Sequence, residues 1–95
     1  MKYSDDFLPM NQTKQIRDFV ISNFMFGEGA GLNDDASLID RGIVDSTGML
    51  ELIVFLEETF RLKIDPDEMI PENLDSVTKA AAFVSRKTAP AQVQA

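Results

Sequence analysis

The segment from Ser46 to Arg61 constrains the fold of this chain most, because its apolar side chains recur at the spacing of an α-helix. At about 100° per residue, one face of the segment carries Met49, Leu52, Ile53, Leu56 and Phe60. A helix with one continuous apolar stripe is stable when the stripe is buried against other elements. The segment therefore predicts an amphipathic helix that packs into a core.

A second amphipathic segment precedes it, from Thr13 to about Phe26, and ends in the glycine-rich stretch 27–31. Asn11 or Thr13 is expected to cap its start. A long connection, residues 32–45, joins the two helices, and a connection of this length in a small domain is more often functional than idle. Its apolar side chains are expected to pin it to the core: Leu32, Leu38, Ile39 and Ile43.

The C-terminal part of the sequence adds two shorter helical segments. Two prolines leave room only for a turn or a one-turn helix around 67–70. Asp75 and Ser76 form a cap pair for a last helix that runs to about Lys87. No segment has credible strand character. The sequence therefore predicts an all-α fold, a small four-helix bundle with three longer helices, one short helix and a long loop between the first and the second.

Ninety-five residues allow one small domain. We expect an N-terminal extension over 1–10, the folded domain over 11–87 and a flexible C-terminal tail over 88–95. The sequence has neither the apolar run of a membrane span nor that of a signal peptide. We therefore expect a cytoplasmic monomer.

The composition argues against several classes of function. The chain has no cysteine and no histidine, which removes thiolate-ligated zinc, a cysteine nucleophile and the commonest general base. Ser46 lacks a histidine partner and is a poor hydrolase nucleophile. The net charge of −7 argues against nucleic acid or an anionic membrane as the main partner. We expect neither an enzyme nor a metal site.

Acidic residues are concentrated in the middle of the chain. Residues 28–75 hold thirteen acidic and three basic residues, so this stretch should attract basic surfaces. The outer arc of the helix over 46–61 carries Thr47, Leu50, Glu51, Val54 and Glu58, with Glu57 at its edge. A helix face that only contacts water has no need of two aliphatic side chains such as Leu50 and Val54, although single exposed aliphatic residues are common. The arc is a candidate partner-docking face.

The chain enters this helix through Gly42-Ile-Val-Asp-Ser46. Ser46 is placed to cap the helix, and Asp45 is placed beside the positive end of the helix dipole. These two residues alone favour a structural cap, because Asp-Ser before an apolar run is common.

The surroundings of the motif add more: Leu38–Ser46 is followed by an acidic helix that ends Phe-Leu-Glu-Glu-Thr-Phe60, by Ile64–Glu68 and by a helix from Ser76. Over about residues 13–86 this order resembles the acyl or peptidyl carrier protein family. The resemblance implies that Ser46 receives a 4′-phosphopantetheine arm from coenzyme A. It also implies that Asp45 assists the transferase, in the family typically by helping to hold its magnesium. The working thiol is then imported on the arm.

The resemblance implies a carrier protein rather than an enzyme, one that presents an acyl thioester within a fatty-acid, lipid or secondary-metabolite pathway. The implied partners are a phosphopantetheinyl transferase, an acyl- or aminoacyl-loading ligase and downstream acyltransferases with basic docking surfaces. The implied partner face is the outer arc of the helix: Thr47, Leu50, Glu51, Val54, Glu57 and Glu58.

Two features bear on the cargo. The pair Thr47-Gly48 departs from the common fatty-acid version of the family, which has leucine after the serine, and is similar to D-alanyl and stand-alone aminoacyl carriers. Bulky rings on the apolar stripes leave little interior volume for an alkyl chain: Phe19, Phe24, Phe60 and Phe83. Both favour a small acyl or aminoacyl cargo. A second hypothesis is that the protein is not a carrier but an acidic helical adaptor, in which Ser46 is only a cap.

Overall fold

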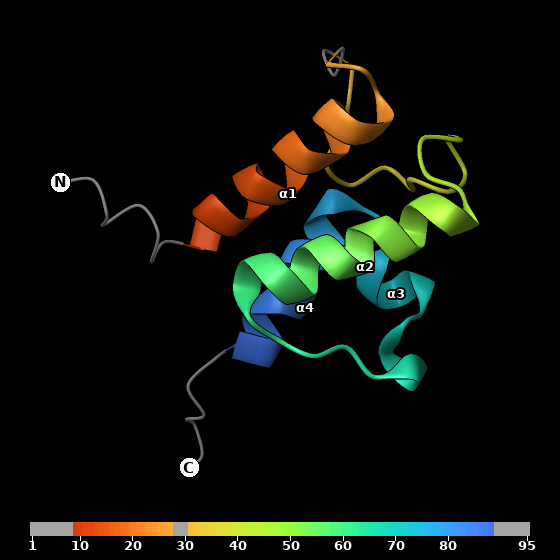
Figure 1. The fold of residues 1–95 in the computed structure, drawn as a ribbon. Helices are drawn as coiled ribbons and strands as arrows, with labels where there is room; N and C mark the ends of the chain where they lie inside the picture. The colour runs from red at the N-terminus through yellow and green to blue at the C-terminus, as the bar shows by residue number, and fades with distance from the viewer. Residues whose placement is uncertain (1–8, 28–30, 89–95) are drawn as a thin grey trace, which may run out of the picture.

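The computed structural model describes residues 9–27 and 31–88, with the side chains of 12–27 and 31–88. Along this part of the chain run α1 (Pro9–Phe24), α2 (Ser46–Phe60), the 3₁₀-helix η2 (Pro66–Glu68), α3 (Pro71–Leu74) and α4 (Val77–Thr88), and the described ranges contain no strand (Figure 1). The predicted all-α bundle of three longer helices and a short one, with a long first loop, is confirmed.

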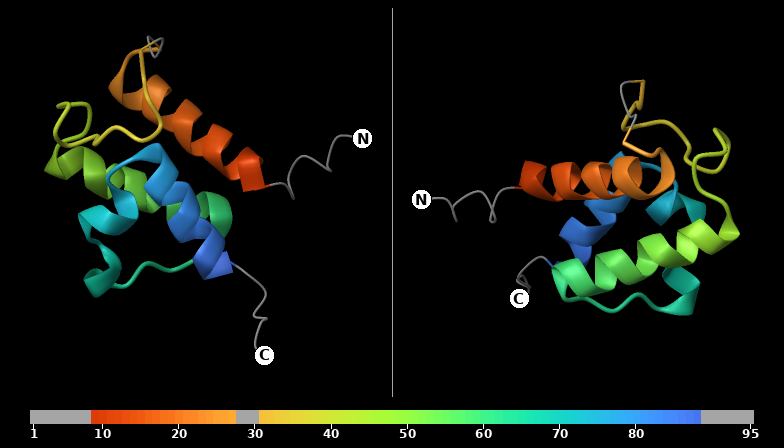
Figure 2. Two further views of the ribbon diagram at one scale, coloured as in Figure 1. Left: turned by 180° about the vertical axis from the view of Figure 1, so that it is seen from behind. Right: turned by 45° about the horizontal axis from the view of Figure 1, so that its top comes forward.

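The three longer helices enclose the core. α1 and α2 run in roughly opposite directions, and both α1 and α3 pack chiefly against α4 (Figures 1 and 2). The side chains buried between the helices include Ile16, Val20, Leu52, Leu56, Val77 and Val84. Each such side chain contributes about 1.5–3 kcal/mol when it is removed from water. The predicted apolar face of α2 is confirmed, with Met49 and Phe60, near the two ends of the helix, half-buried.

The start and end of α1 differ from the prediction. The helix begins at Pro9, so Asn11 and Thr13 lie inside it, and the prediction that one of them caps the helix was wrong. Proline suits the first turn of a helix because no intrahelical bond needs its missing N–H there. The helix ends at Phe24, because Phe26 takes a left-handed backbone conformation with φ 53°.

The region of the two prolines also differs. Pro66 opens η2 and Pro71 opens α3, each at a position where proline removes no helical hydrogen bond. The predicted turn or one-turn helix around 67–70 is confirmed by η2, which begins one residue earlier, while α3 is a further short helix that was not predicted. The next helix begins as predicted, because Ser76 caps α4: its Oγ accepts a hydrogen bond from the N–H of Lys79 at 2.9 Å.

The division into extension, domain and tail stays a prediction. Residues 1–8 and 89–95, which include most of the predicted extension and tail, lie outside the described residues, and α1 begins two positions before the boundary at 11. None of the described helices is long and apolar enough to cross a membrane.

Candidate functional site

The start of α2 is built around Asp45. This residue has an extended backbone, with φ −101° and ψ −170°, and its Oδ1 accepts a hydrogen bond from the N–H of Gly48 at 2.8 Å. Asp45 is therefore the N-cap, and the prediction that Ser46 caps the helix was wrong. Ser46 is instead the first helical residue, and its side chain is exposed. Its hydroxyl makes no hydrogen bond within the described part of the chain.

Gly48 fixes how closely α1 approaches this helix start. It is buried, and a Cβ at this position would lie 2.8 Å from Cε1 of Phe24, closer than real side chains come. The last residue of α1 thus packs against the first turn of α2 at the one place where α2 has no side chain. Glycine at position 48 therefore has a structural reason, because a side chain there would collide with the ring of Phe24.

The loop that leads to Ser46 is bonded to two helices, α1 and α4. Arg17 of α1 donates to the carbonyl oxygen of Leu32 at 3.0 Å and to Oδ1 of Asp34 at 2.6 Å. The N–H of Thr78, in α4, donates to the carbonyl oxygen of Asp34 at 3.0 Å. These contacts fix the N-terminal half of the loop across the end of the bundle.

The apolar residues of the loop partly follow the prediction. Leu32 and Leu38 are buried as expected, and Val44, which was not singled out, is buried as well. Ile43 is half-buried and packs against the core. Ile39 is 46% exposed, so its expected role as an anchor was wrong. Its backbone, and not its side chain, ties it to the bundle, as described below.

An open groove of about 480 Å³ runs between α1 and α2, beginning at Thr47, directly beside Ser46. Its α2 wall contains five of the six predicted partner residues: Thr47, Leu50, Glu51, Val54 and Glu58. Leu50 and Val54 are 61% and 49% exposed, which is unusual for aliphatic side chains next to each other on one helix face. The structure thus brings the predicted arc together as one wall of a groove.

The floor and opposite wall come from residues that the sequence analysis did not place there. Phe19 of α1 stacks on Phe55 of α2, with ring centroids 4.1 Å apart and planes 15° from parallel. Asn23 and Thr59 complete the lining. A smaller adjoining groove of about 360 Å³ shares these four residues and extends along α1 to Gln15.

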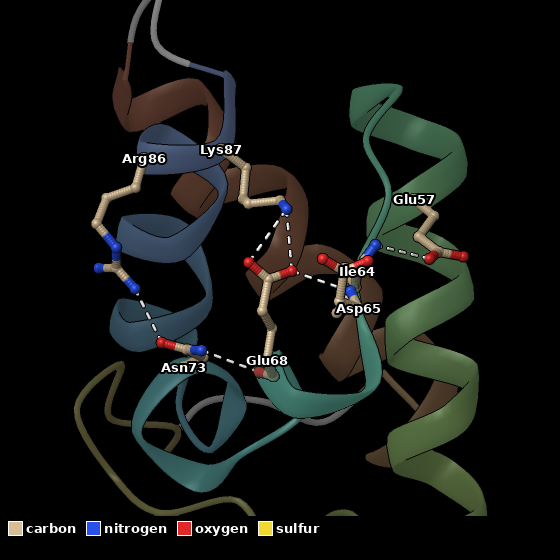
Figure 3. A network of polar contacts seen from close by, with 7 residues as sticks. All are labelled: Glu57, Ile64, Asp65, Glu68, Asn73, Arg86 and Lys87. Carbon is tan, nitrogen blue, oxygen red and sulfur yellow. Dashed lines mark hydrogen bonds and ion pairs between the residues drawn. The ribbon is translucent and has the colours of Figure 1, made fainter.

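A signal for Phe55 was present in the helical periodicity. At 100° per residue, Phe55 lies between the apolar stripe and the outer arc, about 60° from Leu52, on the side of Glu51. Glu57 lies at the opposite boundary of the arc. The structure places it away from the groove, half-buried, with its Oε2 accepting a hydrogen bond from the N–H of Ile64 at 2.9 Å (Figure 3).

The aromatic rings are distributed differently from the expectation of a ring-filled interior. Phe83 is buried, at 3% exposed. Phe19, Phe24 and Phe60 are only half-buried and form a connected cluster with Phe55: Phe24 meets Phe19 edge-on at 5.7 Å, and Phe60 meets Phe55 edge-on at 6.1 Å. Most of the rings therefore serve the contact between α1 and α2 and not the centre of the bundle.

Comparisons with known proteins identify relatives of this chain. No protein-family model matches the chain. The chain is similar to a D-alanyl carrier protein of Streptococcus pyogenes serotype M5 (strain Manfredo), at 39% identity over 66 residues, which cover 67% of this chain and 84% of the relative. It is also similar to a D-alanyl carrier protein of Abiotrophia defectiva, at 34% identity over 55 residues, which cover 58% of this chain and 70% of the relative. The chain therefore belongs to the family of carrier proteins that includes the D-alanyl carrier proteins.

Proposed function

We propose that this carrier protein holds a small acyl or aminoacyl group as a thioester on a 4′-phosphopantetheine arm attached to Ser46. The main support is that Asp45 caps α2 through the N–H of Gly48, which leaves Ser46 exposed at the first position of the helix. A serine used as a cap would have its oxygen committed to a backbone N–H. Here the capping is done by its neighbour.

The residues around Ser46 fit a phosphate ester. The start of a helix presents backbone N–H groups and the positive end of the dipole, both of which favour a phosphate. Once attached, the arm supplies a thiol, a group that this chain lacks because it contains no cysteine. Asp45 is exposed as well as capping, so its carboxylate is accessible to the transferase and its magnesium ion.

Attachment of the arm is a phosphopantetheinyl group transfer from coenzyme A to Ser46. The Ser46 oxygen forms a bond to the phosphorus of the pantetheine phosphate in coenzyme A, and the bond from that phosphorus to the adenosine bisphosphate breaks. The adenosine bisphosphate leaves with the bonding electron pair. The hydroxyl proton passes to a base of the transferase, because this chain has no histidine to accept it.

We propose that partners dock on the α1–α2 groove. Its α2 wall combines the exposed side chains of Leu50 and Val54 with the carboxylates of Glu51 and Glu58. Such a surface suits partners with basic docking residues around an apolar contact, such as the transferase, a loading ligase and downstream acyltransferases. Weak, salt-sensitive binding suits a carrier that must leave each partner after one visit. Glu57 is not part of this proposal, because its carboxylate is bonded to Ile64.

For the cargo, the relatives named D-alanyl carrier proteins favour the aminoacyl alternative over a fatty-acyl chain. The interior supports the same choice, because Phe83, Leu52, Leu56 and the other core residues are packed with little exposure. We therefore propose an amino acid such as alanine, or a short acyl group, as the cargo.

The attachment is tested by intact-mass analysis after incubation with a phosphopantetheinyl transferase of broad acceptor range, coenzyme A and magnesium. Wild type and the control variant Ser22→Ala, at an exposed serine of α1, should gain the mass of one arm, and Ser46→Ala should gain none. A modified Ser46→Ala protein would refute the assignment of the serine. An unmodified wild type would favour the adaptor that carries nothing.

The size of the cargo is tested by loading the arm with acyl groups of two, eight and sixteen carbons and comparing unfolding midpoints. A carrier that buries its cargo gains up to about 0.8 kcal/mol per buried methylene. We expect the three midpoints to agree closely. A steady rise with chain length would contradict the small-cargo proposal, because it would mean that the core opens to receive the chain.

A further inference from the structure

A buried carboxylate at the junction of α3 and α4 holds the loop that leads to Ser46. Asp75 is only 9% exposed. The hydroxyl of Ser37 donates to its Oδ2, and the N–H of Ile39 donates to its Oδ1 at 2.9 Å. Its own carbonyl oxygen accepts the N–H of Leu38 at 3.0 Å. One residue thus bonds three consecutive residues of the loop.

The segment held in this way shapes the rest of the loop. The carbonyl oxygen of Leu38 accepts the N–H groups of Ile43 at 2.9 Å and of Val44 at 3.2 Å, which closes residues 38–44 into a compact turn. The side chains of Leu38 and Val44 are buried, at 0% and 1% exposed. Asp45 follows Val44 directly and caps α2. A continuous series of contacts therefore runs from Asp75 through the loop to Ser46.

We propose, on the basis of the function proposed above, that Asp75 is a positioning residue for the attachment of the arm. It holds the loop in the conformation in which the transferase meets Asp45 and Ser46. Asp75 bonds to residues 37–39 and acts through the loop, so it takes no part in the chemistry itself. Asp45 bonds to Gly48 within the first turn of α2, so its cap does not by itself fix where the preceding loop lies.

Removal of the Asp75 carboxylate should raise the KM of the transferase for this carrier. Without the carboxylate, the N–H of Ile39 loses its acceptor in a partly buried place, and the loop exchanges with other conformations. When only a fraction of the carrier molecules has the competent loop, the apparent affinity falls by that fraction. Once bound, the loop is in place, so kcat changes little. A KM effect of about tenfold corresponds to a competent fraction of about one tenth.

The test compares two neighbouring variants, Asp75→Ala and Ser76→Ala. Ser76 is 1% exposed and caps α4 through Lys79, so Ser76→Ala also removes a buried polar contact but leaves the loop bonds intact. We expect the KM of Asp75→Ala in the transferase reaction to rise by about tenfold, and that of Ser76→Ala to stay within about twofold of wild type. Asp75→Asn keeps one acceptor oxygen and should lie between them; it also replaces Asp75→Ala if that variant does not fold.

Amide hydrogen exchange of the unmodified protein gives a second reading that needs no transferase. Exchange at Ile43 and Val44 should be faster in Asp75→Ala and unchanged in Ser76→Ala. Equal KM values for the two variants, or unchanged exchange at Ile43 and Val44 in Asp75→Ala, would overturn the inference while wild type is still modified at Ser46. A wild type that is not modified would overturn the proposed function itself.

Discussion

The two sides of α2 differ in what they do with acidic side chains. The side that faces α1 is an open groove. The side that carries Glu57 is closed by the segment after α2, which a hydrogen bond from Ile64 to Glu57 holds in place (Figure 3). Glu57 and Glu58 are neighbours in the sequence but point about 100° apart around the helix. Glu58 lines the groove and is exposed, and Glu57 is half-buried and bonded. Position around the helix axis, and not charge, decides their roles.

The segment that closes this side is itself held by a network centred on Glu68, which begins at Asp65, directly after Ile64. Its carboxylate accepts two hydrogen bonds from Nζ of Lys87, at 2.9 and 3.1 Å, and one from the N–H of Asp65 at 2.9 Å. Asn73 donates to its carbonyl oxygen at 2.9 Å, and Arg86 donates to Asn73 at 2.8 Å. The network joins η2 and α3 to the last turn of α4 (Figure 3).

On the open side the acids remain available. The ion pairs between described residues are Lys14–Asp18, Arg17–Asp34 and Lys87–Glu68, and none includes Glu51 or Glu58. Leu50 and Val54 are likewise exposed, whereas Leu52, Ile53 and Leu56 on the core-facing side of α2 are buried. The same helix therefore contributes to the fold with one side, while its other side stays exposed, as the proposed docking face requires.

The largest expected effect separates two leucines of α2. Leu56 is 0% exposed, so Leu56→Ala should lower the free energy of unfolding by about 2–5 kcal/mol. Leu50 is 61% exposed, so Leu50→Ala should change it by no more than about 0.5 kcal/mol and should weaken docking instead. Urea unfolding gives the first quantity and titration with the transferase the second. Comparable destabilisation by both variants would mean that the groove is part of the core.

A smaller effect distinguishes the two adjacent glutamates. Glu57→Ala leaves the N–H of buried Ile64 without its acceptor and should cost about 1–3 kcal/mol of stability. Glu58→Lys should leave stability within about 0.5 kcal/mol of wild type, because the side chain is exposed. It should instead slow association with the transferase.

The salt concentration provides a control for the effect on the association rate. The effect of Glu58→Lys, and of Glu51→Lys beside it in the groove, should shrink as the salt concentration rises from about 50 to about 300 mM, because salt screens exposed charges. Equal association rates for wild type and both variants at low salt would show that partners use another face.

The architecture was predictable from periodicity, but the details at the site were not. The stripe of Leu52, Ile53 and Leu56 predicts α2 because a single helix face must be buried. The choice of cap was beyond this reasoning, since aspartate and serine are both good N-caps and differ here only in which residue first takes helical angles. Only the backbone decides that Asp45 caps and Ser46 is left exposed.

Contacts between distant segments explain the other differences. Glu57 lies at the boundary of the arc, and its role depends on the chain after α2 folding back to present Ile64. Asp75 was recognised only as half of a cap pair, because its partners lie 36 and 38 positions earlier in the chain. Gly48 could be recognised by resemblance, while its reason, the ring of Phe24, lies on another helix.

The smallest expected effect tests the closed side through its pH dependence. The pKa of Glu68 lies below its ordinary value of 4.5, first because the N–H of Asp65 bonds to the carboxylate and next because Lys87 does; partial burial acts in the opposite direction. Since the folded protein holds this proton less tightly than the unfolded chain, the stabilisation is complete above about pH 4.5 and is lost as the pH falls through the lowered pKa. Wild type should therefore exceed Glu68→Gln in free energy of unfolding at about pH 7, and the difference should shrink toward about pH 3. Lys87→Gln should reduce this pH dependence without abolishing it, because the hydrogen bond from Asp65 remains. A difference between wild type and Glu68→Gln that is equal at both pH values would show that the carboxylate contributes through its shape and not through its charge.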